Sequence, residues 1–324
     1  MAHHHSTVTD WNALSLDDYS ERVLASGHVQ RLIELCFEED LGAGGTPGDV
    51  TSALCVSDDQ AGSEVRTKLR SRERAKVAGL AFIPTICAVF APGACRWEPA
   101  ATDGDSVEKG TLLGELSGPR GAVLAIERTM LNLVSRLSGI ATLTDRYVRA
   151  IRDAGADTER VRLLDTRKTT PGHRLIEKYA VRCGGGYSHR IGLYDAVLVK
   201  DNHIAMADRG LEGILEALAT ARERFDLQFV EVEVDSLEQF ETILKAEKNT
   251  PGLVDIVLLD NMPPDTLREA VALRQQADSR IQLEASGGIT LETIGAIAMT
   301  GVDRISTGAI THQARSVDFG LDAG

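Results

Sequence analysis

The sequence predicts an α/β protein, an incomplete parallel α/β-barrel preceded by a smaller α+β domain. From about residue 161 onward, short runs rich in Val, Ile and Leu alternate with amphipathic helical stretches, which is typical of a parallel sheet covered by helices. Polar residues follow each of these runs, and they would converge on one mouth only if the strands form a ring. We count six or seven runs, fewer than the eight strands of a complete barrel.

Composition limits the classes of function. The chain of 324 residues has a formal net charge of -13 and a pI near 5.1, which argues against the broad basic face that nucleic acid requires. No apolar run approaches the ~18 residues of a membrane helix. The start, MAHHHSTVTDW, lacks the apolar core of a signal peptide, and the five cysteines form no CxxC pair. We therefore expect a cytoplasmic protein with reduced thiols that binds neither nucleic acid nor membrane.

The first part of the chain is expected to fold separately. Residues 1–27 are interpreted as a flexible leader, in which the His run at 3–5 is a tag or tail rather than a metal site. Helical spacing of apolar residues predicts a helix over Val29–Glu39. Short apolar runs between turns over Glu64–Leu116 predict strands of one sheet. Ala122–Ala154 predicts one long helix or a broken pair.

These patterns set the expected domain boundaries. The leader is followed by an N-terminal domain over residues 28–140 and by the barrel over residues 141–314. The tail, residues 315–324, has apolar residues at alternate positions, so we expect it to return to the N-terminal domain.

Strands and helices alternate through the predicted barrel. The expected strands are VRLLDT, DAVLVK, LQFVEVEV, VDIVLL, IQLEAS and DRIST. The expected helices are Arg174–Val181, Leu211–Phe225, Leu237–Glu247, Asp265–Gln276 and Leu291–Thr300.

A basic segment within this acidic protein indicates a small anionic ligand. Residues 162–190 contain seven Lys or Arg and two His, against one Asp and one Glu. A cationic pocket in an acidic protein is expected where a small, multiply anionic molecule is held. Three of these cations are spaced four apart and are assigned to a solvated helix face: Arg174, Lys178 and Arg182.

Arg167, His189 and Arg190 are the best candidates in this segment to bind carboxylates. A guanidinium grips a carboxylate through two hydrogen bonds, and an imidazole can add a hydrogen bond or a charge. Phosphate is expected elsewhere, at the glycine-rich turns Ser286-Gly287-Gly288 and Ser306-Thr307-Gly308, which follow the last two strands. The alternative for these turns is a tight chain reversal with no ligand.

Glu233 and Asp260 stand at neighbouring strand ends beside the basic cluster. Such carboxylates suit ribose hydroxyls, or Mg²⁺ that arrives with a pyrophosphate. The alternative is a simple ion pair with Lys168 or Lys200. Glu231 shares the parity of Glu233, so the sequence leaves open which of the two faces the site.

Lys200 ends an apolar strand and supports two chemistries. It could bind an anion, or it could form a Schiff base if desolvation and neighbouring cations lower its pKa. The second option defines a rival of a different class, a barrel lyase or aldolase. A lysine that simply reaches solvent past the strand end is the third option.

The order of motifs closely resembles that of the quinolinate phosphoribosyltransferase family over roughly residues 28–322. The motifs are GDVT, ERT, SGIAT, DTRKTTPGHR, GGGYSHRIGLYDAVLVKDNH, EVEVDS, LLDN, SGGI, STGAITH and DFGLD. The resemblance implies an N-terminal α/β sandwich domain, an incomplete α/β-barrel and a homodimer whose active sites are shared between subunits. It also implies the condensation of quinolinate with phosphoribosyl pyrophosphate, with Mg²⁺, to nicotinate mononucleotide, pyrophosphate and CO₂ on the route to NAD.

The resemblance also implies roles for individual residues. Lys168, Lys200, Glu233 and Asp260 would be catalytic: the lysines would face the substrates' anionic groups, and the acids would face the ribose hydroxyls and Mg²⁺. The two glycine turns would hold the 5-phosphate. The quinolinate carboxylates would be surrounded by Arg167, His189, Arg190 and, supplied by the partner subunit, Arg128.

Three rivals follow from the same residues. A nicotinate phosphoribosyltransferase of the same barrel type would grip one carboxylate rather than two, so four cationic ligands favour quinolinate. A Schiff-base lyase would use Lys200. A non-enzymatic anion-binding protein would have little use for acidic residues beside a phosphate site.

Overall fold

The computed structural model describes residues 8–323, and the chain divides into two compact units. The barrel unit contains residues 8–13, 146–168 and 186–309, and the N-terminal unit contains residues 14–145, 169–185 and 310–323. One unbroken helix, α6 (Arg120–Asp153), contributes residues to both units. No helix of the described chain is long and apolar enough to cross a membrane.

Six parallel strands form the sheet of the barrel unit, in the order β6-β11-β10-β9-β8-β7. The last of these strands along the chain pairs with the first, as in a ring. β6 and β7 stand at the two ends of this order, and among the described residues β6 makes an isolated bridge from Leu164 to Tyr187, which precedes β7 in the chain. The prediction of an incomplete parallel α/β-barrel is therefore confirmed. The strands are β6 (Arg162–Leu164), β7 (Val197–Val199), β8 (Val230–Val234), β9 (Ile256–Asp260), β10 (Gln282–Ser286) and β11 (Arg304–Ser306).

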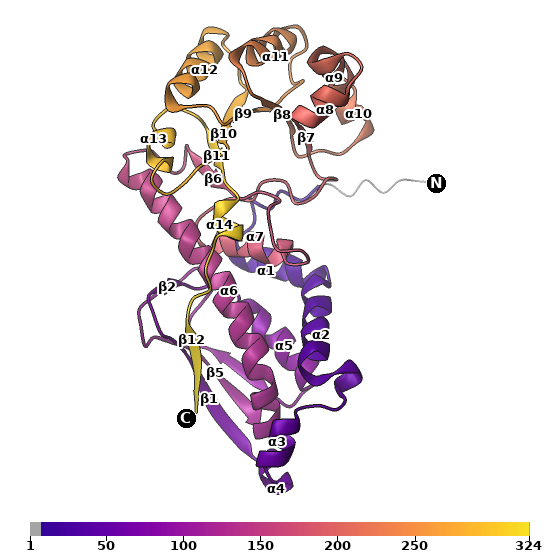
Figure 1. Cartoon of the computed structure of the whole chain (residues 1–324), viewed down its shortest axis with the longest axis vertical. Helices are drawn as coiled ribbons and strands as arrows, with labels where there is room; N and C mark the ends of the chain where they lie inside the picture. Colours follow the sequence, from indigo (N-terminus) through magenta and orange to yellow (C-terminus); the bar gives the residue numbers. More distant parts are fainter. Residues whose placement is uncertain (1–7, 324) are drawn as a thin grey trace. The chain divides into compact units, whose positions relative to one another are not determined.

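Helices cover the outside of this sheet, and successive helices pack against one another, as α9, α11, α12 and α13 do (Figure 1). The expected helix Leu211–Phe225 is broken in two at Thr220, whose backbone leaves the helical region at φ −107° and ψ 3°; its hydroxyl lies 3.4 Å from the Ala217 carbonyl oxygen. The helices are α8 (Asp201–Met206), α9 (Gly210–Leu218), α10 (Ala221–Arg224), α11 (Leu237–Asn249), α12 (Pro264–Gln276) and α13 (Ile294–Ala298).

The N-terminal unit contains a four-stranded antiparallel sheet in the order β12-β1-β5-β3 and a separate two-stranded sheet, β2-β4. The expectation of one sheet is therefore wrong. The end of the chain supplies an edge strand, because β12 pairs with β1 from Ser71 opposite Phe319 to Thr67 opposite Ala323. The strands are β1 (Glu64–Ser71), β2 (Ala75–Lys76), β3 (Arg96–Pro99), β4 (Ser106–Val107), β5 (Leu112–Pro119) and β12 (Phe319–Ala323).

Helices pack beside this sheet: α2 contacts α5 through an edge-to-face pair of Phe37 and Phe90, with ring centroids 5.2 Å apart, and α5 contacts β3. The remaining helices are α1 (Leu16–Ala25), α2 (His28–Leu41), α3 (Val50–Cys55), α4 (Asp58–Ala61), α5 (Ile83–Phe90), α7 (Arg174–Cys183) and α14 (Ala309–His312), with 3₁₀ turns η1 (Ala43–Gly45) and η2 (Leu80–Phe82).

The prediction that residues 1–27 form a flexible leader is wrong for most of the residues that the structure describes there. Ser15 caps α1 by accepting a hydrogen bond from the Asp18 backbone N–H. Tyr19 and Val23 on this helix are fully buried, and the Tyr19 ring lies 5.7 Å from that of Tyr179. Burial of these side chains holds the segment to the unit. Residues 1–7, with the His run, lie outside the described residues.

The solvated helix face expected for Arg174, Lys178 and Arg182 is also wrong. Lys178 is fully buried and the two arginines are half-buried. Glu177 beside it is fully buried too, and its Oε1 lies 2.8 Å from Nη2 of Arg136 on α6. The face is enclosed because α1, formed by the supposed leader, packs on α7.

Candidate functional site

The structure brings the predicted polar residues of the barrel to one end of its sheet. Because all six strands are parallel neighbours, the segments that follow their carboxyl ends share one edge. In ring order these positions belong to Lys168 after β6, Ser306 in β11, Ser286 in β10, Asp260 in β9, Glu233 in β8 and Lys200 after β7. We refer to this edge as the mouth of the barrel.

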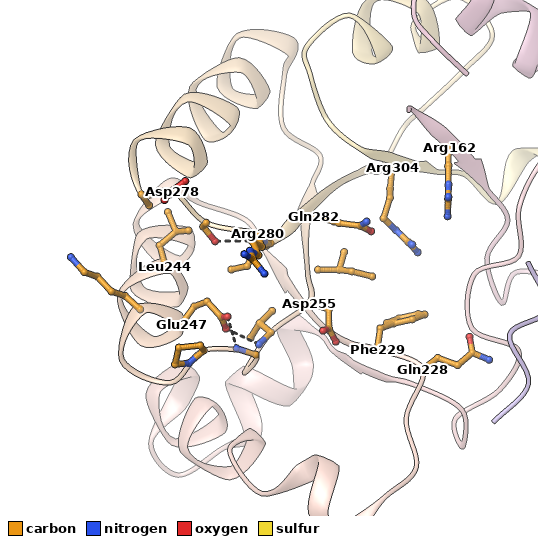
Figure 2. A pocket seen from close by; sticks show the side chains of 18 of the residues that line it. Arg162, Gln228, Phe229, Leu244, Glu247, Asp255, Asp278, Arg280, Gln282 and Arg304 are labelled. Carbon is orange, nitrogen blue, oxygen red and sulfur yellow. Dashed lines mark hydrogen bonds between the residues drawn. The ribbon is translucent and has the colours of Figure 1, made fainter. Parts of the chain in front are cut away.

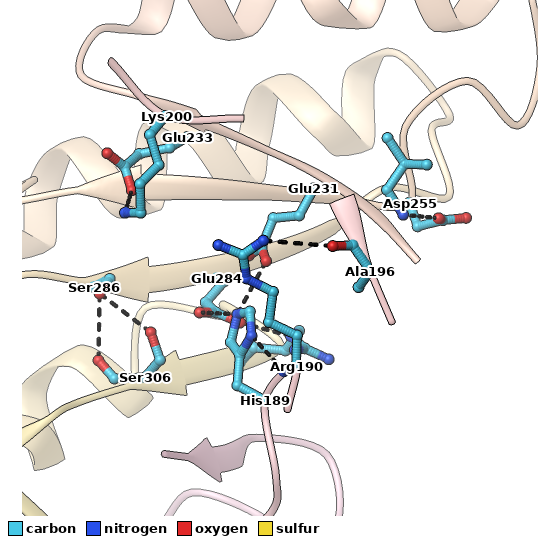
Figure 3. A network of polar contacts seen from close by, with 12 residues as sticks. His189, Arg190, Ala196, Lys200, Glu231, Glu233, Asp255, Glu284, Ser286 and Ser306 are labelled. Carbon is cyan, nitrogen blue, oxygen red and sulfur yellow. Dashed lines mark hydrogen bonds and ion pairs between the residues drawn. The ribbon is translucent and has the colours of Figure 1, made fainter. Parts of the chain in front are cut away.

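Lys200 and Glu233 form an ion pair at the mouth, with Nζ and Oε2 2.5 Å apart (Figure 3). The ion-pair alternative for Glu233 is thus realised in the ligand-free structure. The Lys200 side chain is 44% exposed, so it is not the desolvated lysine that Schiff-base chemistry needs. The open question of parity is also resolved: Glu233 lies at the mouth, whereas Glu231 is fully buried inside the barrel.

The glycine turn after β10 is built by close backbone approach. Gly287 has φ of +92°, and a β-carbon there would lie 2.3 Å from Oδ1 of Asn261. The Asn261 backbone N–H donates to the Ser286 carbonyl oxygen at 2.9 Å. Ser286 is joined to the neighbouring turn by a 3.1 Å hydrogen bond from Oγ of Ser306. Such a turn leaves backbone N–H groups unobstructed by side chains, which is what an anion requires.

Beneath the mouth lies a buried charge network formed by His189, Glu231, Glu284 and Arg304 (Figure 3). His189 Nε2 lies 3.0 Å from Oε2 of Glu231 and 3.3 Å from Oε1 of Glu284. Arg304 Nε donates to Oε2 of Glu284 at 2.7 Å. The imidazole and two carboxylates could hold a metal ion, but the cation of Arg304 and the protons of His189 already oppose the two acids.

Charge balance sets the protonation of this network. Burial acts to lower the pKa of His189, but the carboxylates of Glu231 and Glu284 outweigh it and raise that pKa to about 9. Burial together with the charge of Glu284 raises the pKa of Glu231. Burial would raise the pKa of Glu284 as well, yet His189 and Arg304 hold it well below its usual range. At neutral pH, His189 and Glu231 together therefore hold one more proton in the folded protein than the same two side chains would hold in water.

Both ring nitrogens of His189 face protein atoms. Nδ1 lies 2.7 Å from the Arg190 backbone nitrogen, while Nε2 faces the two buried carboxylates. These contacts tie His189 to the backbone of Arg190, and the role of His189 as a substrate-carboxylate ligand stays a prediction.

Arg190 and Arg167 form a local excess of positive charge. Burial, followed by the charge of Arg167, lowers the pKa of Arg190. Nη1 of Arg190 has a long hydrogen bond of 3.4 Å to the Ala196 carbonyl oxygen, and Arg167 is exposed. Two guanidinium groups whose charges repel each other suit an anion with more than one negative charge.

Two aspartates missed in the sequence hold the segment that carries Arg190. Asp165, fully buried after β6, accepts from the His189 backbone N–H at 2.9 Å. Asp195 accepts from the backbone N–H groups of Ile191 and Gly192 at 2.7 and 2.8 Å. Carboxylates that cap several backbone N–H groups fix a loop without a strand ladder. The signal available in the sequence was an Asp at each end of a glycine-rich segment.

Arg128 belongs to the N-terminal unit, where it is exposed on α6. It lines a pocket of about 370 Å³ together with Asp49. Asp49 caps α3, accepting from the backbone N–H groups of Thr51 and Ser52 at 3.0 Å each. The GDVTS motif and the ERT motif thus meet at one surface of this unit.

Comparison with known proteins covers both units. Residues 49–138 match the family model described as quinolinate phosphoribosyl transferase, N-terminal domain, and residues 140–322 match the C-terminal domain of the same family. The chain is 40% identical over 295 residues to a probable nicotinate-nucleotide pyrophosphorylase (carboxylating) of Bacillus subtilis, with 91% of this chain and 93% of the relative covered. It is 38% identical over 275 residues to the nicotinate-nucleotide pyrophosphorylase (carboxylating) of Mycobacterium leprae, with 85% and 90% covered.

A solved structure supports the same assignment. The nicotinate-nucleotide pyrophosphorylase from Francisella tularensis superimposes with a TM-score of 0.80 at 34% sequence identity, over 98% of this chain and 99% of that one. The matched family models, the identity over most of the chain and the shared fold agree with the motifs at the mouth. The chain belongs to the quinolinate phosphoribosyltransferase family.

Proposed function

We propose that this protein condenses quinolinate with phosphoribosyl pyrophosphate and releases nicotinate mononucleotide, pyrophosphate and CO₂, as a step in the synthesis of NAD. The observation that carries the proposal is the set of polar residues at the mouth, where Lys168, Lys200, Glu233 and Asp260 stand at strand ends beside a glycine turn suited to phosphate. Family membership supports the same reaction.

The choice of quinolinate over nicotinate follows from charge. A single carboxylate is satisfied by one guanidinium. The barrel unit offers exposed Arg167 and buried Arg190, whose charges repel each other, and we propose that Arg128 of a second subunit completes the set. Three guanidiniums match the two adjacent carboxylates of quinolinate better than the one carboxylate of nicotinate. We propose His189, whose ring contacts the Arg190 backbone, as a further ligand of these carboxylates.

Glu233 and Asp260 fit the requirements of Mg²⁺ in part. They lie at the ends of adjacent strands, β8 and β9, and they offer hard carboxylate oxygens. Two carboxylates suit a Mg²⁺ whose other ligands are water and substrate oxygens. When bound, the ion would neutralise charge on the pyrophosphate as it leaves. Glu233 is paired with Lys200, so we propose that binding of Mg²⁺ to Glu233 competes with this ion pair.

The protein's own groups account for the remaining chemistry. Departure of pyrophosphate from ribose C1 leaves an oxocarbenium-like centre. Lys168 and Lys200 stabilise the departing phosphates, while Glu233 and Asp260 orient the ribose hydroxyls. The arginines hold the quinolinate carboxylates so that the ring nitrogen faces C1. Once that nitrogen is quaternary, it stabilises the electron pair left on the adjacent carbon when its carboxylate departs as CO₂. A proton from water then adds to that carbon and gives nicotinate mononucleotide, without a covalent enzyme intermediate.

We also propose that the protein is a homodimer whose active sites are shared between subunits. We further propose that it is located in the cytoplasm. The dimer is supported by Arg128, an exposed cation of the N-terminal unit, which has a role only if it reaches a barrel mouth. The cytoplasm is supported by the five free thiols at residues 36, 55, 87, 95 and 183, because thiols persist in reducing compartments.

The reaction is tested by incubating the purified protein with phosphoribosyl pyrophosphate, Mg²⁺ and either quinolinate or nicotinate. We expect nicotinate mononucleotide and an equal amount of CO₂ from quinolinate alone. Product from nicotinate without CO₂ would transfer the assignment to a nicotinate phosphoribosyltransferase. Omission of Mg²⁺ with added chelator should abolish turnover, and unchanged turnover would remove the ion from the proposal.

A further inference from the structure

A second pocket lies at the opposite end of the barrel strands from the mouth. It has a volume of about 990 Å³ and is lined by the first residues of four strands: Arg162 of β6, Arg304 of β11, Gln282 of β10 and Ile256 of β9 (Figure 2). Its lining residues all belong to the barrel unit. None of the residues assigned to the reaction lines it. Its volume is in the range of small-molecule sites.

Two arginines stand side by side in this pocket. Arg162 and Arg304 are paired in the parallel register of β6 and β11, so their side chains leave the sheet on the same face. Figure 2 shows both side chains extending in the same direction, toward Phe229. Neighbouring guanidiniums repel unless an anion lies between them.

The contacts of these two arginines leave part of their hydrogen-bonding capacity unused. The Arg304 side chain is nine-tenths buried, and its Nη2 has no hydrogen-bond partner among the described residues. Its Nε is used by Glu284. Arg162 lies with Cζ 5.0 Å above the ring of Tyr187 and pairs with no carboxylate in the described chain. Arg304 is thus ion-paired with Glu284, whereas the exposed Arg162 is the guanidinium of the pair that is left to bind an anion from the pocket.

Four acidic residues line the pocket, Asp10, Glu247, Asp255 and Asp278, and the first three already have partners. Asp255 pairs with Arg222 and accepts from the Val230 backbone N–H at 2.6 Å. Glu247 accepts from three successive backbone N–H groups, at residues 252–254. The wall near the arginines is neutral and polar, with Gln228 and Gln282 (Figure 2). The pocket is therefore cationic at the arginines and offers amide groups beside them.

We propose that this pocket binds a small organic anion, with its carboxylate or phosphate between the guanidinium groups of Arg162 and Arg304. The neighbouring glutamine amides hydrogen-bond the polar part of the ligand, and its carbon skeleton lies among Phe229 and the apolar residues of the lining. This is an additional ligand site, separate from the reaction at the mouth.

Methyl resonances give a direct test, because Leu244, Val254, Ile256 and Ile281 line this pocket and lie outside the mouth. The protein is labelled at Ile, Leu and Val methyl groups and titrated with phenyl phosphate, with benzoate, and with uncharged benzyl alcohol. We expect saturable shifts of these methyls with one or both anions and none with the alcohol. The anion effective at lower concentration identifies phosphate or carboxylate as the preferred group.

Arg162→Gln is the diagnostic variant, because its side chain is exposed and Arg304 also supports the buried network. We expect Arg162→Gln to weaken the response about tenfold or more, with kcat unchanged. The matched control is Arg268→Gln, an exposed arginine on α12, which should titrate like the wild type. Absent shifts, equal shifts with the alcohol, or an unweakened response in Arg162→Gln would each overturn the proposal. These reporters do not depend on turnover, so the result is independent of the proposed reaction.

Discussion

At the scale of single residues, the interior of the barrel depends on charge balance. Glu284 is fully buried and contacts both His189 and Arg304. A buried carboxylate is tolerated only when cations or hydrogen-bond donors surround it. The same network fixes the backbone of Arg190 through His189. The network that balances these charges is therefore also in contact with the backbone of a predicted substrate ligand.

Glu284→Gln should destabilise the protein by about 3–5 kcal/mol near pH 6, because it leaves Arg304 without a charged partner. The effect depends on pH. The raised pKa of His189 gives stability that is complete below its ordinary value of 6.5 and is lost as the pH rises through about 9. The lowered pKa of Glu284 gives stability that is present above its ordinary value of 4.5 and is lost as the pH falls.

Urea unfolding at several pH values measures this difference. The gap between wild type and Glu284→Gln should be widest between the two ordinary pKa values, 4.5 and 6.5, and narrower near pH 9. Glu241→Gln, in an exposed pair with Lys245 on α11, is the control and should change stability by less than about 1 kcal/mol. Equal stability of Glu284→Gln and wild type at pH 6 would contradict the network's role.

At the scale of elements, the turn after β10 is the most demanding piece of backbone at the mouth. Gly287→Ala would place a β-carbon 2.3 Å from Asn261 Oδ1, in a residue whose φ is +92°. The turn must shift, so we expect KM for phosphoribosyl pyrophosphate to rise about tenfold or more, with a smaller effect on kcat. Steady-state kinetics checks this.

Gly93→Ala is the control that separates the effect of backbone strain from displacement of the turn after β10. Gly93 also has a positive φ, +72°, but nothing lies within 4 Å of a β-carbon there. It should cost about 1 kcal/mol of stability and leave KM unchanged. A normal KM in Gly287→Ala would mean that this turn does not hold the phosphate.

The elements also show what the sequence could and could not predict. Alternation of apolar strands and amphipathic helices was sufficient to predict the incomplete barrel, because each strand–helix unit has its own local signal. The break between α9 and α10 and the helix α1 in the supposed leader were missed. Both depend on tertiary contacts or on the backbone conformation of one residue, which periodicity does not report. The second sheet, β2-β4, has only two residues in each strand and leaves no pattern.

The candidate site divides in the same way. Positions at strand ends, such as Lys200, Glu233 and Ser286, were identified because the end of a strand is visible in the sequence. The burial of Lys178, the depth of Glu231 and the inward orientation of His189 were not, because they depend on which face a neighbouring element covers. Asp165 and Asp195 were missed because they bind backbone rather than substrate.

At the scale of the whole molecule, a shared active site makes a quantitative prediction. Arg128→Ala and Lys168→Ala should each be nearly inactive as homodimers, because each removes a group from every site. When the two are unfolded and refolded together, half of the dimers are mixed and each mixed dimer has one intact site. We expect recovery of about a quarter of wild-type turnover.

Lys168→Ala mixed with Lys200→Ala is the matched control. Both residues belong to the barrel unit, so every site in a mixed dimer lacks one lysine and no recovery is expected. If the first mixture is no more active than its components, Arg128 and Lys168 do not serve the same site across a dimer.

The seam between β6 and β7 gives the barrel a mechanical property. Among the described residues β6 has an isolated bridge to Tyr187 and none to β7 itself. The chain between Tyr187 and β7 is held by side-chain contacts that include the carboxylates of Asp165 and Asp195. A hydrogen-bonded ladder opens cooperatively, whereas isolated side-chain contacts open one at a time. The position of Arg190 is therefore expected to be more sensitive to single substitutions than that of a residue within a strand, because one carboxylate replaces several ladder hydrogen bonds.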